Sequence, residues 1–571
     1  MLIHGRLIET GRGYSLSYRG KTLLSVMDPA AQAERALGTV SLVNRTLYFC
    51  PSPLFGYGLE GFLERLSGES PDSAVLCVEA EEELLELSGN AMKGLLENPR
   101  LRLAGAGDPG ALCDFVRDAW GSRRFRRVEP LRLSGGWRLH RELYDSLAGV
   151  LREDIALEWG NAVTLMKLGR RYMRNAVRNL ALVPSCRSLR DLSFGARPVL
   201  VLGAGPSLDG LLDCLERRFG ESLRDGAPEG SRSFKIMCVD TALPAMRARR
   251  IKPDLAVALE SQHWNIRDFT GLGDWELPLA MDLSALPETA EMLGSRVHLF
   301  FTPWTPLRVF GRLEKAGLLP ERLRPLGSVG LAAAAAALRL GSGPVLCGGI
   351  DFSFTPDSYH ARSTPGHREK LREHNRFQGV LNAGAGFRPG TSAASAKSGA
   401  AVRSDAVMRG YRDLFEREFS GTRIIGISGG GLHLGVKTVD AEEACGLLGE
   451  NAGSAAGEHT DAAAGENAGR AAGKTRAGKK EDLLRFVRGE RESLAELRDI
   501  LTGETAAGAE RLDGLLDGLD YLWAHLPGCA GRGGARPPAS DIAFLKMVRA
   551  EIDPFLKLWK GLAEKLTQRG S

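Results

Sequence analysis

The pattern of apolar and polar positions divides the chain into segments of different character. From about Phe194 to Val436, short apolar runs alternate with amphipathic stretches. Such alternation predicts a mostly parallel β-sheet with helices on both faces. The runs that we predict as strands of this sheet are 199–202, 235–239, 255–259, 279–281, 297–301, 345–347 and 424–427. The fold class is therefore α/β, with a central Rossmann-like domain.

A smaller α/β domain is predicted before it, within residues 1–110. Thr46–Cys50 and 74–79 have the composition of buried strands, and a glycine-containing turn and the helix 59–66 separate them. The second strand ends in Glu79, as in half of a Rossmann unit, where an acid at this position bonds a ribose. Because the glycine pattern is incomplete, we favour a purely structural α/β unit.

The remaining segments differ in composition. Residues 111–193 are predicted to be a helical connecting region, and 194–439 to be the central domain. Residues 440–480 are rich in Ala, Gly, Glu and Lys, which predicts a disordered linker. A C-terminal helical domain is expected at 481–571, with helices at 483–501, 509–526 and 542–566. Gly, Ala and Ser dominate 378–401, which predicts a mobile loop that could serve as an active-site lid.

Composition narrows the class of protein. The chain has 571 residues, too many for one hydrophobic core, and a net charge of only +5. No basic block is interleaved with aromatic residues, so nucleic acid is not a favoured partner. The nine cysteines are scattered without a Cys-x-x-Cys pair, which favours reduced, buried thiols over disulfides or a zinc site. No signal peptide or membrane-length apolar run is present, so we expect a cytoplasmic protein.

The strongest candidate for chemistry follows the first central strand. The apolar run 198–202 ends abruptly in Gly203-Ala204-Gly205-Pro206-Ser207 and an amphipathic segment. Gly203 and Gly205 permit a tight turn and close backbone approach. Pro206 suits a first helical position, and Ser207 suits a helix cap. Strand, turn and helix start together form an anion site, where backbone amides and the helix dipole face a phosphate. The alternative is a strand-to-helix turn that binds no ligand.

Four more strands end in residues that could take part in chemistry. Ligands of open α/β sheets bind at the carboxyl ends of strands, so polar residues at several strand ends indicate a shared binding site. These strand ends carry Asp240, Glu260, Asp282 and the turn Gly348-Gly349-Ile350-Asp351.

Five short motifs, in order over about 240 residues, resemble the motility-accessory-factor (Maf) flagellin glycosyltransferases. The related 6-hydroxymethylpterin diphosphokinases (MptE-like domain) and bacterial sialyltransferases share parts of the pattern. The motifs are Gly203–Asp209, Val239–Leu243 with Ile251–Asp254, Leu259–Gln262, Gly327–Gly330 with Gly348–Phe352, and Tyr359–Arg362. The resemblance implies a sialyltransferase-like central domain.

The resemblance also implies an activity. The enzyme would transfer a nonulosonic acid, of the pseudaminic or legionaminic type, from a CMP-activated donor to Ser or Thr of flagellin. It would need no metal. Its partners would be the nucleotide-sugar donor and flagellin as the acceptor protein. The sequence does not decide whether the chain forms a homo-oligomer.

Roles for single residues follow from the same resemblance. Asp240 and Thr241 would hold ribose or base, the Glu260 motif would contribute to the site, and Ser328 and Gly330 would add a second set of helix-start amides. Asp351 and His360 are the candidates for catalysis near the sugar and acceptor. Each has a structural alternative: Ser207 as a helix cap, Asp240 and Asp351 as turn residues, His360 as a surface loop residue.

One departure from the family pattern leaves alternatives open. In the sialyltransferases a histidine precedes the helix before the last strand, but here 401–405 reads Ala-Val-Arg-Ser-Asp. Either His360 or Asp405 replaces that base, or the chemistry differs. If Glu260, Asp282 and Asp351 bound Mg²⁺, the chain would act as a pterin diphosphokinase-like phosphotransferase. A third alternative is a non-catalytic flagellin-binding protein.

Overall fold

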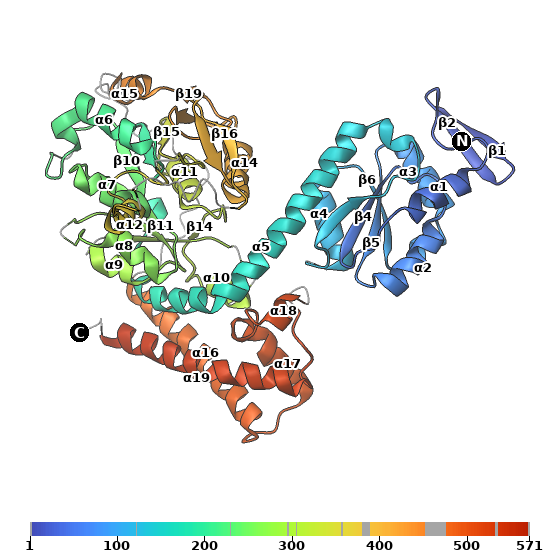
Figure 1. Ribbon diagram of the computed structural model, residues 1–571. Coiled ribbons are helices and arrows are strands. Elements are labelled where there is room, and N and C mark those ends of the chain that lie inside the picture. The colour runs from blue at the N-terminus through green and yellow to red at the C-terminus, as the bar shows by residue number, and fades with distance from the viewer. Residues whose placement is uncertain are drawn as a thin grey trace, which may run out of the picture. The chain divides into compact units, whose positions relative to one another are not determined.

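The chain folds into two compact units (Figure 1). The computed structural model describes residues 3–121, 123–228, 230–273, 275–293, 296–303, 305, 307–355, 358–377, 379, 389–450, 476–531 and 535–568. One unit comprises Met1–Gly169 and Trp523–Phe544, and the other Arg170–Leu522 and Leu545–Ser571. Helix α5 (Arg141–Asn179) contributes residues to both.

The first unit contains a four-stranded parallel sheet in the order β6-β5-β4-β7. Its strands are β4 (Thr46–Pro51), β5 (Ala74–Glu79), β6 (Leu101–Gly105) and β7 (Arg127–Pro130). Helix α2 (Leu59–Glu69) connects β4 to β5, so the predicted strand–helix–strand order is confirmed. Strand β7 lies inside the region expected to be helical. The unit also contains β1 (Gly5–Thr10), β2 (Gly13–Tyr18), β3 (Lys21–Thr22), α1 (Pro29–Gly38), α3 (Glu82–Ala91), α4 (Pro109–Trp120) and α18 (Pro527–Gly531).

Glu79, the acid at the end of β5, lies inside this unit. Its side chain is 2% exposed, and its Oε1 accepts hydrogen bonds from the Tyr144 hydroxyl at 2.9 Å and the Ala80 amide at 3.1 Å. Burial raises the pKa of this carboxyl. A side chain enclosed in this way fits the structural interpretation of the unit better than ribose binding.

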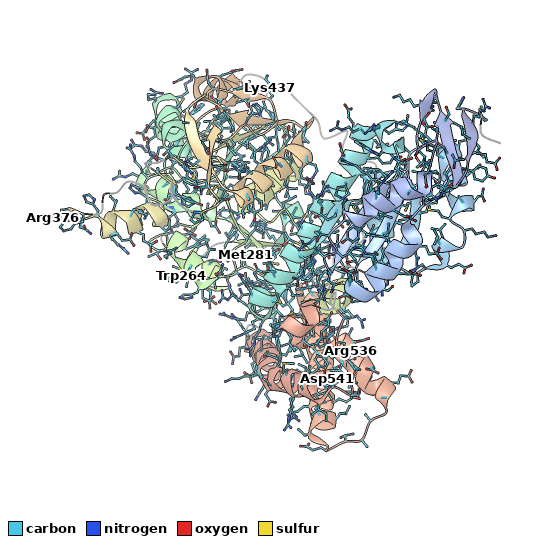
Figure 2. All side chains as sticks on the ribbon, turned by 45° about the vertical axis from the view of Figure 1, so that its right-hand side comes forward. Trp264, Met281, Arg376, Lys437, Arg536 and Asp541 are labelled. Carbon is cyan, nitrogen blue, oxygen red and sulfur yellow. The ribbon has the colours of Figure 1, made fainter. Side chains whose placement is uncertain are left out.

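The second unit is built on a large parallel sheet in the order β14-β13-β12-β11-β10-β9-β15-β18-β19, with β8 paired to β13. All seven predicted strands are present. The strands are β8 (Arg187–Ser188), β9 (Val199–Leu202), β10 (Lys235–Val239), β11 (Leu255–Ala258), β12 (Leu279–Asp282), β13 (Val297–Phe301), β14 (Glu321–Arg322), β15 (Val345–Gly348), β18 (Ile424–Ile427) and β19 (Thr438–Val439). Met281 of β12 lies in the interior of the unit, whereas Trp264 and Arg376 lie at its edge (Figure 2).

The strand order reverses between β9 and β15. From β9 the chain proceeds outward through β10 to β14, and it then returns to place β15 on the other side of β9. Helix α11 (Val329–Leu340) precedes β15 in the chain. Its alanine-rich sequence allows it to pack closely against the sheet, and most of its residues are buried. Such a switch point leaves a crevice at the carboxyl ends of the two strands.

Other helices cover the sheet or extend beyond it. They are α6 (Leu208–Phe219), α7 (Leu243–Ala248), α8 (Ile266–Phe269), α9 (Glu288–Leu293), α10 (Arg308–Lys315), α12 (Pro365–Glu373), α14 (Ala406–Phe419), α15 (Ala441–Glu450), α16 (Arg476–Thr502), α17 (Ala509–Gly518) and α19 (Ile542–Gln568). None of the helices within the described ranges is long and apolar enough to cross a membrane.

Two stretches expected to be irregular contain regular elements. Strands β16 (Ser392–Ser395) and β17 (Ala401–Ser404) form an antiparallel hairpin, in which β16 lies inside the expected loop 378–401 and β17 begins at its last residue. Helix α15 and the start of α16 occupy both ends of the expected linker 440–480. The Ala, Glu and Leu residues of α15, and the Arg, Ala and Lys residues at the start of α16, are strong helix formers. Residues 451–475 and 380–388, where the linker and loop predictions also fall, lie outside the described part.

Most of the C-terminal helical segment belongs to the second unit rather than to a domain of its own. The Arg312 guanidinium on α10 donates to Glu490 Oε1 on α16 at 2.6 and 2.9 Å, and the Tyr521 hydroxyl donates to Glu490 Oε2 at 3.1 Å. These bonds compensate the cost of removing the Glu490 carboxylate from water. Glu490 is only 5% exposed, and burial raises its pKa.

Candidate functional site

A cavity of about 430 Å³ lies at the switch point of the large sheet. Its walls come from the segments after β9, β10 and β15 and from the starts of α11 and α14. The volume falls in the range of small-molecule sites. The predicted site residues that line it are Gly203, Ala204, Gly205, Thr241, Ser328, Gly330, Asp351 and His360. Segments far apart in sequence thus meet where the motifs predicted a ligand.

The start of α6 is already occupied by a carboxylate of the chain itself. Asp351 Oδ2 accepts the Ser207 amide at 2.8 Å, and Oδ1 accepts the Ser207 hydroxyl. Burial raises the pKa of Asp351, and the hydrogen bonds from Ser207 and the positive charge of Lys397 oppose that rise. Both oxygens are engaged, so Asp351 is suited to holding the corner in place rather than to transferring protons.

The glycines of this corner serve contacts within the protein. The Gly203 and Gly205 amides donate to the carbonyls of Gly348 and Gly349, both at 2.8 Å. A Cβ on Gly203 would lie 2.4 Å from the Gly349 oxygen, and one on Gly205 would lie 2.4 Å from Asp351 Oδ2. The expected phosphate cradle at α6 therefore needs correction, because the amides of Gly203, Gly205 and Ser207 are already bonded.

Pro206 and Ser207 also differ from their expected roles. Helix α6 begins at Leu208, so Pro206 precedes the first helical position by two residues, and neither residue lines the cavity. Ser207 occupies the N-cap position but makes no capping bond with its side chain, because its hydroxyl donates to Asp351.

The start of α11, unlike the bonded corner at the start of α6, has backbone amides beside the cavity for which the described residues offer no acceptor. Ser328 is the N-cap residue, with φ −131° and ψ 135°, and its side chain makes no capping bond. Its carbonyl accepts the Ala332 amide at 3.0 Å. Within the described part of the chain, no acceptor is found for the amides of Val329, Gly330 and Leu331. With Ser328, Val329 and Gly330 lining the cavity, these unbonded donors and the positive helix end favour an anion there.

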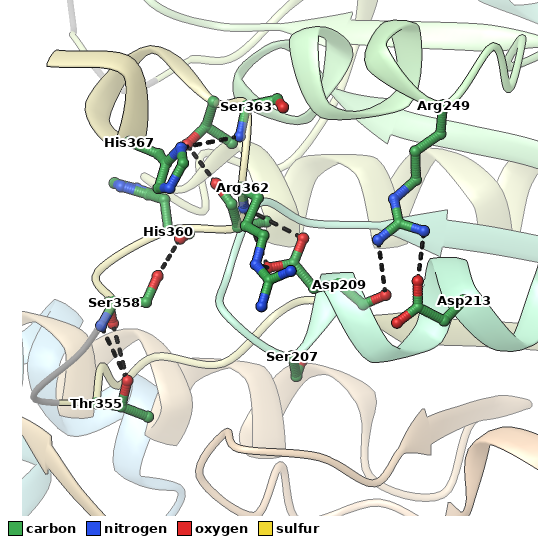
Figure 3. A network of polar contacts seen from close by, with 12 residues as sticks. Ser207, Asp209, Asp213, Arg249, Thr355, Ser358, His360, Arg362, Ser363 and His367 are labelled. Carbon is green, nitrogen blue, oxygen red and sulfur yellow. Dashed lines mark hydrogen bonds and ion pairs between the residues drawn. The ribbon is translucent and has the colours of Figure 1, made fainter. Parts of the chain in front are cut away.

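His360 reaches the cavity on a segment anchored to α6 (Figure 3). The Ala361 amide donates to the Ala204 carbonyl at 2.9 Å, and the Arg362 amide donates to both oxygens of Asp209 at 3.1 and 3.2 Å. The Ser358 hydroxyl donates to the His360 carbonyl. Burial lowers the pKa of the imidazole, which keeps it neutral and able to accept a proton at neutral pH.

Asp240 and Glu260 do not line the cavity. Asp240 is 2% exposed, and its Oδ1 accepts the amide of Thr241 at 2.8 Å, which places the Thr241 side chain at the cavity instead. Glu260 Oε1 accepts the Gln262 amide at 2.8 Å. Both acids stabilise strand-end turns, which was the structural alternative for Asp240.

Asp240 is expected to make stability depend on pH. Burial raises its pKa from 3.8 to about 6, so the folded state holds this proton more tightly than the unfolded state. The free energy of unfolding should therefore decrease as pH rises from about 4 to 6. The side chain in the Asp240→Asn variant cannot ionise. The free energy of unfolding of this variant should therefore rise by on the order of 3 kcal/mol relative to that of wild type between pH 4 and about 6. Urea titrations between pH 4 and 7 measure the difference, and parallel curves would contradict the assignment.

The cavity wall formed by α14 was largely missed by sequence reasoning. Val407, Met408 and Tyr411 line it, and the Tyr411 hydroxyl donates to the Gly327 carbonyl at 2.8 Å. Asp405, the alternative base, also lines the cavity, and its Oδ1 caps α14 through the Met408 amide at 2.8 Å. The spacing 407, 408, 411 on one helix face was the available signal.

The three carboxylates considered for magnesium are each engaged separately. Asp282 accepts hydrogen bonds from the amides and hydroxyls of Ser284 and Thr302. Asp351 is bonded to Ser207, and Glu260 to Gln262. In the ranges that the structure describes, no three His, Cys, Asp or Glu side chains are grouped as metal ligands would be.

Comparison with known proteins finds similarity to a family model and to a relative. The family model described as 6-hydroxymethylpterin diphosphokinase MptE-like matches residues 170–357, which include most of the cavity. A protein of Treponema pallidum (strain Nichols), described as uncharacterized, is 28% identical over 574 residues, covering 98% of this chain and 96% of that protein. Residues 170–357 of the second unit are thus similar to the MptE-like family model.

The solved structure of the Maf glycosyltransferase from Magnetospirillum magneticum AMB-1 is similar over nearly the whole chain. The TM-score is 0.50 at 14% identity, over 99% of this chain and 95% of that one. The chain has the fold of a Maf glycosyltransferase, as the motifs indicated, including the flanking segments outside the MptE-like domain.

Proposed function

We propose that this protein is a glycosyltransferase that transfers a nonulosonic acid, of the pseudaminic or legionaminic type, from a CMP-activated donor to a Ser or Thr hydroxyl of flagellin. The fold shared with a Maf glycosyltransferase supports the reaction class. The motif resemblance supplies the donor and the acceptor. The observation that carries the proposal is the cavity at the switch point, with the unbonded amides of α11 at its wall.

Those amides suit the donor phosphate. In this reaction the bond from the anomeric carbon to the phosphate oxygen breaks, and CMP leaves with the electron pair. Amides and a helix dipole aimed at the leaving phosphate would stabilise the charge that develops on it. Hydroxyls of Thr241 and Ser328 and the rings of Tyr359 and Tyr411 provide polar and flat surfaces for ribose and base.

His360 is the preferred base for the acceptor. Its neutral imidazole would take the proton of the acceptor hydroxyl as that oxygen bonds to the anomeric carbon. Asp405 is the weaker candidate, because its carboxylate caps α14. Asp351 would act as a positioning residue that fixes the corner between β9 and α6 against the turn after β15.

Thermal shift measurements test the proposal. CMP and CMP-nonulosonate are expected to raise the melting temperature, whereas a UDP-sugar and ATP with Mg²⁺ are not. A ligand at 100 times its Kd stabilises the folded state by about 2.7 kcal/mol, which such an assay detects readily. No response to CMP at millimolar concentration would refute the proposed donor.

The description of the matched family model favours a second candidate, an Mg²⁺-dependent pterin diphosphokinase-like phosphotransferase. A response to ATP only with Mg²⁺ would support it. The separate engagement of Asp282, Asp351 and Glu260 gives that reaction no prepared metal site among the described residues. If no nucleotide raised the melting temperature but flagellin did, the chain would be a non-catalytic flagellin-binding protein.

A further inference from the structure

A second cavity, of about 500 Å³, lies between α16 and α19, outside the segment that the MptE-like model matches. Cationic side chains from both helices surround it: Arg488, Arg491, Arg498, Lys557 and Lys560. Glu492 is the single acid among its lining residues. We call this surface the basic groove. Its position on two regular helices makes it a fixed feature rather than a loop conformation.

Three of the five cations that line the basic groove make no ion pair with any residue that the structure describes. Arg498 is paired with its neighbour Asp499 at 2.9 Å, and Lys560 lies 3.8 Å from the exposed Glu564. For Arg488, Arg491 and Lys557, no ion pair or hydrogen bond is found within the described part of the chain. Arg488, Arg491 and Lys557 share this concavity with one acid, Glu492, so a net positive charge remains there and favours an anionic partner.

Two apolar residues, Ala495 on α16 and Leu556 on α19, line the groove together with the cations. A groove between two helices that combines apolar and cationic side chains matches an acidic amphipathic helix, which places its apolar face in such a groove. Single-stranded nucleic acid sites use aromatic rings for base stacking, and no aromatic residue lines this groove.

We infer that the basic groove docks an acidic amphipathic segment of the acceptor protein. This inference rests on the proposed function for the identity of the partner as a protein acceptor, and it assigns the C-terminal helices a role in acceptor recognition. Electrostatic attraction would speed association and make binding sensitive to salt.

Fluorescence anisotropy with the full chain tests the inference. The probe is a fluorescein-labelled amphipathic peptide with glutamates on one helical face and leucines on the other. Wild type is expected to bind it, with affinity decreasing as salt rises. Neutralising the unpaired cations in the triple variant Arg488→Gln, Arg491→Gln, Lys557→Gln should raise the Kd at least about tenfold. Glutamine has a helix propensity close to that of arginine and lysine, so the fold should persist.

A matched variant removes the same charge elsewhere. Arg218→Gln, Lys315→Gln and Arg372→Gln are exposed helix positions of the same unit, and their combination should change the Kd less than about twofold. Equal losses in both variants, no peptide binding, or tighter binding of an oligonucleotide of equal charge would overturn the inference. The CMP response of the groove variant is measured in parallel. If CMP fails in every variant while the peptide distinguishes them, the transferase assignment fails and the groove assignment stands.

Discussion

Val329→Pro is expected to weaken CMP binding at least about tenfold while the free energy of unfolding changes by less than about 1 kcal/mol. Proline at this first helical position removes the amide hydrogen of a residue that lines the cavity, and no acceptor is found for that amide in the described part of the chain. The helix tolerates proline here, because that amide makes no intrahelical bond. Ser328 already has the extended φ of −131° and ψ of 135° that a residue before proline adopts.

The reason for the large effect is that hydrogen bonds to charged groups are worth about 1.5–3 kcal/mol, which is roughly ten- to hundredfold in affinity. Titration calorimetry with CMP and urea denaturation measure the two quantities. Val329→Ala is the matched control, since it removes the same side chain but keeps the amide. If both variants bound CMP equally, the anion would be held elsewhere in the cavity.

Asp351→Ala is expected to destabilise the protein by about 2–3 kcal/mol and to abolish the CMP response. The change removes the acceptor of both the Ser207 amide and the Ser207 hydroxyl, and it loosens the turn after β15 against the start of α6. That contact also fixes the cavity wall, because Gly205 packs directly against the Asp351 side chain.

A double-mutant cycle with Ser207→Ala separates this role from general packing. Ser207→Ala loses one hydrogen bond and should cost about 1 kcal/mol. The double variant should be destabilised by less than the sum of the single changes, because each single change breaks the same bond. Additive losses in urea titrations, or an Asp351→Ala variant as stable as wild type, would remove Asp351 from the positioning role.

The same corner shows why Gly205 is a poor probe of ligand binding. A larger residue there would collide with Asp351 whether or not a phosphate binds. Loss of a CMP response in such a variant would report a damaged fold. Substitutions at the start of α11, such as Val329→Pro, change the cavity without this collision.

The amino-acid sequence by itself determined the strands of the large sheet and the motif residues that meet at its switch point. Runs such as 199–202 and 345–348 are apolar throughout because both faces of a parallel sheet are covered by helices, and this pattern is visible locally. The order of the motifs also indicated the fold, since each motif follows a strand and carboxyl ends of parallel strands share one edge.

Only the tertiary structure decided which helix start is open to a ligand. Local sequence makes the starts of α6 and α11 equivalent, each with glycine and serine before a helix. Asp351, 144 residues away in sequence, occupies the first and leaves the second free. The tertiary structure also buries the Asp240 side chain and brings α14 to the cavity. Whether a donor or acceptor is satisfied depends on partners distant in the chain, which no local pattern records.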